Sequence, residues 1–175
     1  MAWIARLAAG ALALVLAACA TVAPPAALPQ LAAVPQAFEI SGRLSVRQGD
    51  RSEIARLRWT HRPDADLWVI SSPLGNEVAR IESGPRGATL EQAGGPSQAA
   101  ASFSELTERV FGVALEPALL AQWLHGTGRP DAAAGWQVSV EETQRAGTVE
   151  LARRMSARRA DVVVRLVVDE YRAAE

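Results

Sequence analysis

Apolar and polar residues alternate along much of the chain, starting at Phe38. Between residues 38 and 47 the apolar side chains fall on even positions and the polar ones on odd positions. This period of two predicts a half-buried antiparallel strand. Similar runs follow at residues 53–60, 67–71, 77–82 and 88–92, with turns at 48–50, 61–66 and 84–87. Short strands joined by tight turns predict a meander.

The period changes after residue 101. Phe103, Leu106, Val110 and Phe111 have helical spacing, and Ser102 with Glu105 forms a capping box at the start of this helix. Gly112 ends it. A second helix is expected to begin at Pro117 and to end at Gly126.

Period two returns at residues 136–140 and in a long strand at 160–171. Val162, Val164, Leu166 and Val168 lie on one side of the last strand, and Val163 and Val167 on the other, so both its faces are expected to be covered. The chain thus predicts a mainly β fold of roughly seven or more strands with two helices. A strongly twisted sheet curls toward a barrel, and the helix pair at 102–125 is the only candidate cover. Periodicity leaves open whether the enclosed space is hollow or filled.

One turn carries an unusual residue. Leu74 lies between Pro73, which cannot continue a strand ladder, and Gly75, which tolerates positive φ. Either Leu74 folds back onto its own core, or it meets an apolar partner outside the domain.

The N-terminus reads as a targeting segment. Residues 1–18 have a short basic start and an apolar run too short to span a bilayer, as in a signal peptide. Leu16-Ala17-Ala18-Cys19 resembles a bacterial lipobox, in which Cys19 is acylated; the alternative is a secreted protein with an incidental thiol. Ala20, where inner-membrane retention favours Asp, points to the outer membrane. Residues 19–36 are a Pro/Ala tether of roughly 50 Å, and residues 37–175 form the folded domain.

Composition narrows the classes of function. The 175 residues carry a net charge of −1, with 18 basic residues, all arginine, and no basic block. This argues against nucleic acid as a partner. A single cysteine excludes an internal disulfide and a multi-cysteine metal site.

Candidate chemistry is sparse. His61 lies in a predicted turn and His125 at a helix end, where the helix dipole favours its charged form, so both are expected to be solvated or capping. No nucleophile elbow or phosphate loop is present. Arg153-Arg154 and Arg158-Arg159 are expected to flank a hairpin, on a solvated face or against anionic headgroups. We expect no enzyme activity, cofactor or metal.

Several motifs occur in order behind the lipobox. They are Gly42-x-Leu44-x-Val46, Trp59, Ser72-Pro73-Leu74-Gly75 and Leu120-x-x-Trp123-Leu124-x-Gly126. Together they resemble the LolB family of outer-membrane lipoprotein receptors over nearly the whole mature chain. Two features depart from the family pattern: no proline precedes the final strand between Arg153 and Asp161, and Tyr171 stands where a tryptophan is common.

The resemblance implies a half-closed antiparallel barrel with a helical lid over a hydrophobic cavity. It implies a monomer that takes triacylated lipoproteins from a periplasmic carrier, LolA, and inserts them into the inner leaflet of the outer membrane. Leu74 is implied as the residue that releases cargo into the lipid.

The side chains suited to line such a cavity are Leu44, Val46, Leu57, Trp59, Trp68, Ile70 and Trp123. Trp68 and Ile70 have the same strand parity and must face the same side. Two other classes of function stay open: a structural lipoprotein with a solid core that binds a protein through its helix pair, and a lipoprotein that binds a free lipid.

Overall fold

The computed structural model describes residues 33–126 and 135–173. Within these ranges the chain forms nine strands and two helices. The strands are β1 (Phe38–Gln48), β2 (Arg51–Arg62), β3 (Ala65–Ser71), β4 (Glu77–Gly84), β5 (Gly87–Gln92), β6 (Gln98–Ala100), β7 (Gln137–Ala146), β8 (Val149–Arg159) and β9 (Val162–Ala173); the helices are α2 (Phe103–Phe111) and α3 (Pro117–Leu124).

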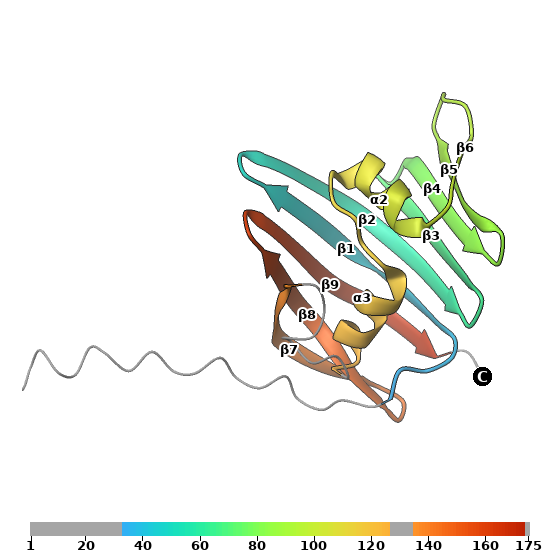
Figure 1. Cartoon of the computed structure of the whole chain (residues 1–175). Coiled ribbons are helices and arrows are strands. Elements are labelled where there is room, and N and C mark those ends of the chain that lie inside the picture. Colours follow the sequence, from blue (N-terminus) through green and yellow to red (C-terminus); the bar gives the residue numbers. More distant parts are fainter. Residues whose placement is uncertain (1–32, 127–134, 174–175) are drawn as a thin grey trace, which may run out of the picture.

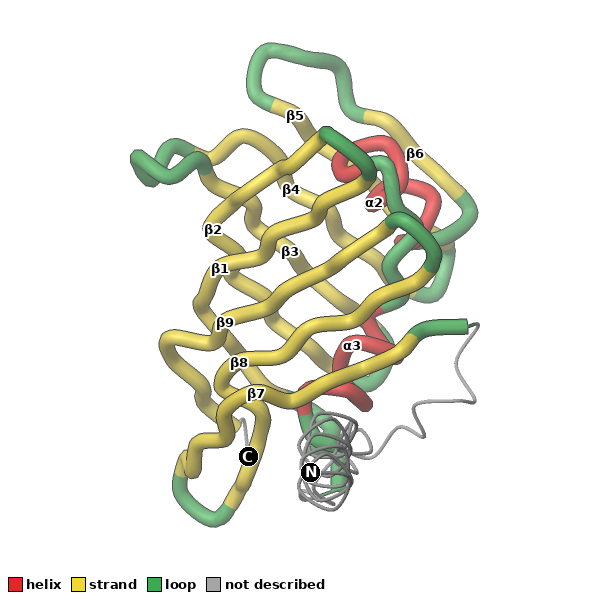
Figure 2. The backbone as a smooth tube through the Cα atoms, turned by 90° about the vertical axis from the view of Figure 1, so that its left-hand side faces the viewer, coloured by secondary structure: helices red, strands yellow, loops and turns green. Residues whose placement is uncertain are grey.

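All nine strands belong to one antiparallel sheet in the order β6-β5-β4-β3-β2-β1-β9-β8-β7. The first and last strands therefore pair at its centre, whereas β6 and β7 form its edges, so the sheet is not closed into a barrel. Figures 1 and 2 show the sheet curving around one side, with both helices lying within the curve. The predicted fold class, a curved and half-closed antiparallel sheet with a helical cover, is confirmed.

The cross-strand register places the core on the face that carries the helices. Ile40, Trp59, Trp68, Ile81 and Leu90 lie directly opposite one another across five neighbouring strands. All five are buried. The opposite, outer face carries the polar residues of the alternation, as a sheet with one covered face requires.

The helices begin as the sequence predicts. The Ser102 hydroxyl accepts a hydrogen bond from the Glu105 amide at 3.3 Å, and Gly112 ends α2 with φ of 72°. Pro117 opens α3, which is capped by His125, one residue before the predicted stop at Gly126. The buried Thr107 fixes the connection between the helices to α2, because its hydroxyl donates to the Ser104 carbonyl at 2.9 Å and accepts from the Leu115 amide at 2.8 Å.

Four local predictions are wrong. The turn expected at 61–66 is shorter, since β2 runs to Arg62 and β3 starts at Ala65. The last strand starts at Val162, because Ala160 adopts φ of 51° in the preceding turn. Strands β6 and β8 were not expected, and both arginine pairs of residues 153–159 lie inside β8 rather than beside a hairpin. In β9, Val163 is buried and Val167 half-buried on the outer face, as predicted.

A β-bulge interrupts the central pairing of β1 with β9. Ser41 pairs with Glu170 and Gly42 with Val168, so Asp169 is the extra residue. The bulge reverses the facing pattern of β9, and Tyr171 therefore points to the interior opposite Ile40. At Gly42 the two backbones approach so closely that a Cβ would lie 2.1 Å from the Val167 carbonyl oxygen.

Candidate functional site

The seven side chains predicted to line a cavity share one interior. Each is at most 2% exposed, and all belong to a single apolar cluster. Trp68 and Ile70 both point inward, opposite Trp59 and Leu57 of the next strand. The sheet residues and Trp123 of α3 therefore do face the same space.

The helices close this interior through aromatic contacts. Phe103, the first residue of α2, packs edge-on against Trp68 with ring centres 5.1 Å apart. Trp123 of α3 packs in the same way against Trp136, just before β7, at 5.5 Å. The indole N–H groups of Trp68 and Trp123 are buried without a hydrogen-bond partner among the described residues. The walls of the interior are thus in contact with one another in this state.

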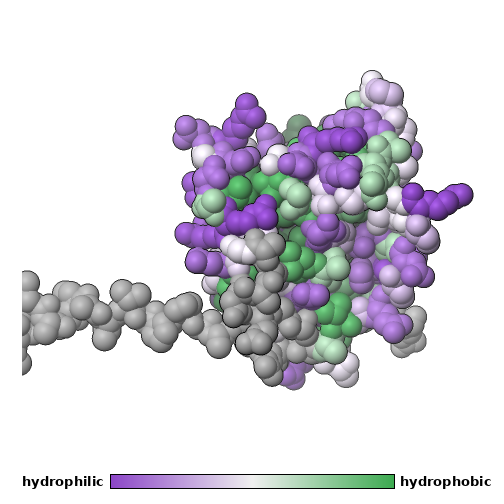
Figure 3. All heavy atoms as spheres, in the orientation of Figure 1, coloured by the Kyte–Doolittle hydropathy of each residue, from purple (hydrophilic) through white to green (hydrophobic). Residues whose placement is uncertain are grey.

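One end of the interior lies beside a groove. Between the end of α2 and the β1–β2 hairpin is a groove of about 210 Å³, lined by residues that include Val46, Glu53 and Phe111. Apolar side chains also gather in a band over the face that carries the helices, bordered by polar ones (Figure 3). Val46 connects this groove to the buried wall residues.

The end of α3 is fixed to the sheet by a buried histidine. The His125 Nδ1 lies 2.8 Å from the Ala121 carbonyl oxygen, and its Nε2 lies 3.1 Å from the Tyr171 hydroxyl. Because a carbonyl only accepts, Nδ1 carries the proton and Nε2 accepts from Tyr171. Phe38 packs against both rings, with centres 5.2 and 5.8 Å away.

Burial decides the charge of this pair. It lowers the pKa of His125 below 6.5, although the hydrogen bond to Ala121 acts in the opposite direction. It also raises the pKa of Tyr171 to about 12. The expectation that His125 caps the helix is therefore confirmed, because its backbone and its ring both bond the Ala121 carbonyl. The expectation that the ring is charged or solvated is wrong, because the side chain is buried and desolvation disfavours the charged form. His61 is not solvated either: its Nδ1 lies 2.8 Å from Asp66, and both side chains are largely buried.

Leu74 protrudes from the domain. Its side chain is 90% exposed, at the tip of the loop between β3 and β4. Two backbone hydrogen bonds of 2.8 Å, from the Ser72 amide to the Asn76 carbonyl and from the Gly75 amide to the Ser72 carbonyl, hold the loop in shape. Of the two interpretations of this turn, folding back onto the core is wrong.

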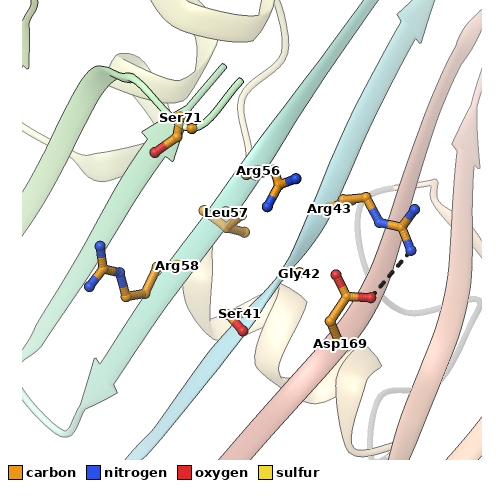
Figure 4. A pocket seen from close by; sticks show the side chains of 9 residues that line it. Ser41, Gly42, Arg43, Arg56, Leu57, Arg58, Ser71 and Asp169 are labelled. Carbon is orange, nitrogen blue, oxygen red and sulfur yellow. Dashed lines mark hydrogen bonds and ion pairs between the residues drawn. The ribbon is translucent and has the colours of Figure 1, made fainter. Parts of the chain in front are cut away.

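A polar groove lies next to this loop on the outer face of the sheet. It has a volume of about 420 Å³, and its lining includes Arg43, Arg56, Arg58, Asp169 and Gly75. In Figure 4 the arginine side chains extend from β1 and β2, and the helices pass behind the sheet. The groove is therefore separate from the apolar interior.

The described residues contain no helix that is both long and apolar enough to cross a bilayer. They also contain no group of three or more His, Cys, Asp or Glu side chains able to hold a metal ion. The predicted signal peptide at 1–18, the acylation site Cys19 and most of the tether at 19–36 lie outside the described residues.

Comparison with known proteins identifies the relatives. The family model of the outer membrane lipoprotein LolB matches residues 36–171. The chain belongs to the LolB family. The outer-membrane lipoprotein LolB of Thiobacillus denitrificans is 34% identical to it over 183 residues, covering 93% of this chain and 95% of that protein. The LolB of Azoarcus sp. strain BH72 is 33% identical, covering 89% of each chain.

A likeness among solved structures concerns the fold alone. A DUF1329 family protein from Desulfovibrio piger superposes with a TM-score of 0.57 and 7% sequence identity, over 79% of this chain and 86% of that one.

Membership of the LolB family confirms the predictions of an outer-membrane lipoprotein and of a role in lipoprotein localisation. The roles of Cys19, of the Pro73-Leu74-Gly75 loop and of the seven interior residues stay predictions. Sequence reasoning missed Phe103, Trp136 and Tyr171, which complete the interior, and the polar groove on the outer face. For Trp136 the only signal was its place as the first apolar residue of the alternation at 136–140.

Proposed function

We propose that this LolB family member accepts triacylated lipoproteins from a LolA-like periplasmic carrier and inserts them into the inner leaflet of the outer membrane. The observation that carries the proposal is that one domain combines a single apolar interior with a leucine that is 90% exposed on a hydrogen-bonded loop. The protein acts as a monomer anchored through acylated Cys19, and outer-membrane lipid is its final partner.

The interior supplies what the cargo needs. Three acyl chains expose about 45 methylenes, each worth about 0.8 kcal/mol on burial. Their passage through water without shielding is therefore prohibitive. Leu44, Val46, Leu57, Trp59, Trp68, Ile70 and Trp123 would line the acyl chains.

Loading requires the helices to move. The walls touch through Phe103 on Trp68 and Trp123 on Trp136, so the chains can enter only if α2 or α3 separates from the sheet. Both helices are short, with nine and eight residues, and helices of that length depend on packing for their stability. Acyl chains would replace the aromatic contacts that the helices lose.

Leu74 acts at the release step. Burying one leucine yields only about 1.5–3 kcal/mol, which is too little to anchor the protein but enough to hold the loop in a leaflet already close by. The loop would then perturb the lipid locally, and the bilayer, as the deeper apolar sink, would take the chains.

The test separates loading from release. Leu74→Glu should bind acylated cargo as the wild type does, because the Leu74 side chain is 90% exposed and does not belong to the apolar cluster of the interior. It should nevertheless fail to deliver the cargo to liposomes. Ile54→Glu is the matched control, since Ile54 is an apolar side chain 60% exposed outside the loop and should deliver normally. Loss of both binding and delivery in Leu74→Glu would contradict the assigned role.

Titration with a triacylated peptide tests the interior itself. Tryptophan fluorescence should change and saturate, because Trp59, Trp68, Trp123 and Trp136 all lie in the interior. A structural lipoprotein with a solid core would show no saturable change.

A further inference from the structure

We infer that the outer-face groove formed by Arg43, Arg56 and Arg58 binds the phosphate of an anionic phospholipid headgroup while Leu74 is inserted in the leaflet. The inference rests on the proposed membrane role of Leu74 and adds a second, polar contact to it.

The position of the groove follows from the strand register. Arg43 of β1 lies directly opposite Arg56 of β2, and Arg56 lies directly opposite Ser71, the last residue of β3. The loop that carries Leu74 starts at the next residue. Gly75, which follows Leu74, also lines the groove. A lipid whose acyl chains surround Leu74 therefore has its headgroup beside these arginines.

The charges of the groove are unbalanced. Arg43 and Arg56 form a like-charge pair across two strands, an arrangement that destabilises a sheet unless an anion compensates it. Neither Arg56 nor Arg58 makes an ion pair with any described residue, whereas Arg43 pairs with Asp169 at 3.2 Å. That pair is more than half exposed, so it is weak and can yield to a phosphate.

Nearby acids do not neutralise the end next to the loop. Glu77, at the far side of the loop, is already bound by Arg80 at 3.0 Å. Glu39 and Glu170 line a neighbouring groove with Arg58, on the side of Ser41 away from Ser71. The positive charge is thus concentrated where the loop begins.

Chemistry and size favour a phosphate ester. Arginine presents paired N–H donors that match phosphate oxygens, and Ser41 and Ser71 add hydroxyl groups. A volume of about 420 Å³ suits a glycerophosphate group. The groove lies on the face opposite the helices and the interior, which disfavours a role in receiving cargo from the carrier.

The experiment uses the full lipidated protein in vesicles. Asn76→Cys introduces a thiol into the loop for labelling with an environment-sensitive fluorophore. Cys19, the only other cysteine, is acylated and does not react with the label. A blue shift of the fluorophore then reports insertion of the loop. The vesicles are phosphatidylcholine alone or phosphatidylcholine with phosphatidylglycerol. Loop insertion should be stronger with phosphatidylglycerol and should weaken as salt rises, because these charges are exposed.

Arg56→Gln with Arg58→Gln should lower the insertion equilibrium on anionic vesicles by about 25-fold, at about fivefold for each charge, and remove its dependence on phosphatidylglycerol. Arg62→Gln with Arg86→Gln is the matched control. Both arginines are exposed and lie at the end of the sheet away from the Leu74 loop: Arg62 is the last residue of β2, and Arg86 lies in the β4–β5 turn. Their loss should change little.

Four results would overturn the inference. Equal insertion on both vesicle types, or an unchanged response of the Arg56/Arg58 variant, would leave the loop proposal intact but refute the headgroup site. Slower transfer from the carrier to this variant without vesicles would make the groove a protein-docking surface instead. Leu74→Glu provides the separate test of the loop: if the wild type inserts on no vesicle and Leu74→Glu behaves identically, the proposed function fails as well.

Discussion

Gly42 should tolerate no side chain, because it lies at the bulge where β1 and β9 approach most closely. In Gly42→Ala the new Cβ would stand 2.1 Å from the Val167 carbonyl oxygen, and contacts under 3.0 Å essentially never occur for a Cβ. The strands must therefore separate by roughly 1 Å, in a region that is packed as densely as a crystal. This weakens one or two backbone hydrogen bonds at about 1 kcal/mol each and adds overpacking strain of about 1–3 kcal/mol. We expect a loss of about 2–5 kcal/mol in the free energy of unfolding.

Urea denaturation followed by tryptophan fluorescence measures this loss. Gly84→Ala is the matched control, because Gly84 also lies in a strand, does not need positive φ, and has no atom within 4 Å of the place that a Cβ would occupy. It should be neutral or slightly stabilising, since alanine restricts the unfolded chain. If Gly42→Ala unfolds at the same urea concentration as Gly84→Ala, the argument from close approach is wrong.

Two further predictions concern buried polar groups. Burial lowers the pKa of His125 below 6.5. As the pH falls through 6.5, His125 therefore becomes protonated in the unfolded chain while it stays neutral in the folded chain. The contribution of His125 to the free energy of unfolding should be fully present above pH 6.5. Below pH 6.5 the free energy of unfolding should fall by up to about 1.4 kcal/mol per pH unit. His125→Gln should remove this part of the pH dependence, as measured by urea denaturation. Asp66 accepts the Trp59 indole N–H at 2.7 Å, so Asp66→Ala leaves a buried donor unpaired and should cost about 1–3 kcal/mol. Asp64→Ala, in the neighbouring exposed turn, should cost little; equal losses would show that the indole hydrogen bond is unimportant.

The strands with regular alternation were predictable from sequence, and so was the capped start of α2. Residues 38–47 and 53–60 show period two because one face of each strand is buried and the other solvated. Strand β8 escaped prediction because its alternation is irregular: Ala152 and Met155 face the core, yet Ser156 is buried as well. Strand β6 has only three residues, too few to show a period.

The features that depend on long-range pairing could not be predicted. His125 is buried because Tyr171, 46 residues away, meets its ring, and Tyr171 faces inward only because Asp169 forms a bulge. The alternation of residues 53–60 is enough to put Arg56 and Arg58 on the polar face of their strand. Their position beside the Leu74 loop follows from the β2–β3 register, which no local pattern records.

The internal hydrogen bonds of the Leu74 loop affect how readily the leucine can enter lipid. Fixing the backbone of one residue in a flexible chain costs about 1–2 kcal/mol in conformational entropy. This cost is comparable to the free energy gained when a single leucine side chain is buried. The hydrogen bonds from the Ser72 and Gly75 amides already fix the backbone of the loop. Its conformational entropy is therefore lost when the domain folds, before the loop meets lipid. The preformed loop thus favours the proposed insertion of Leu74, because a leucine on a flexible segment would lose most of its burial free energy to ordering the backbone.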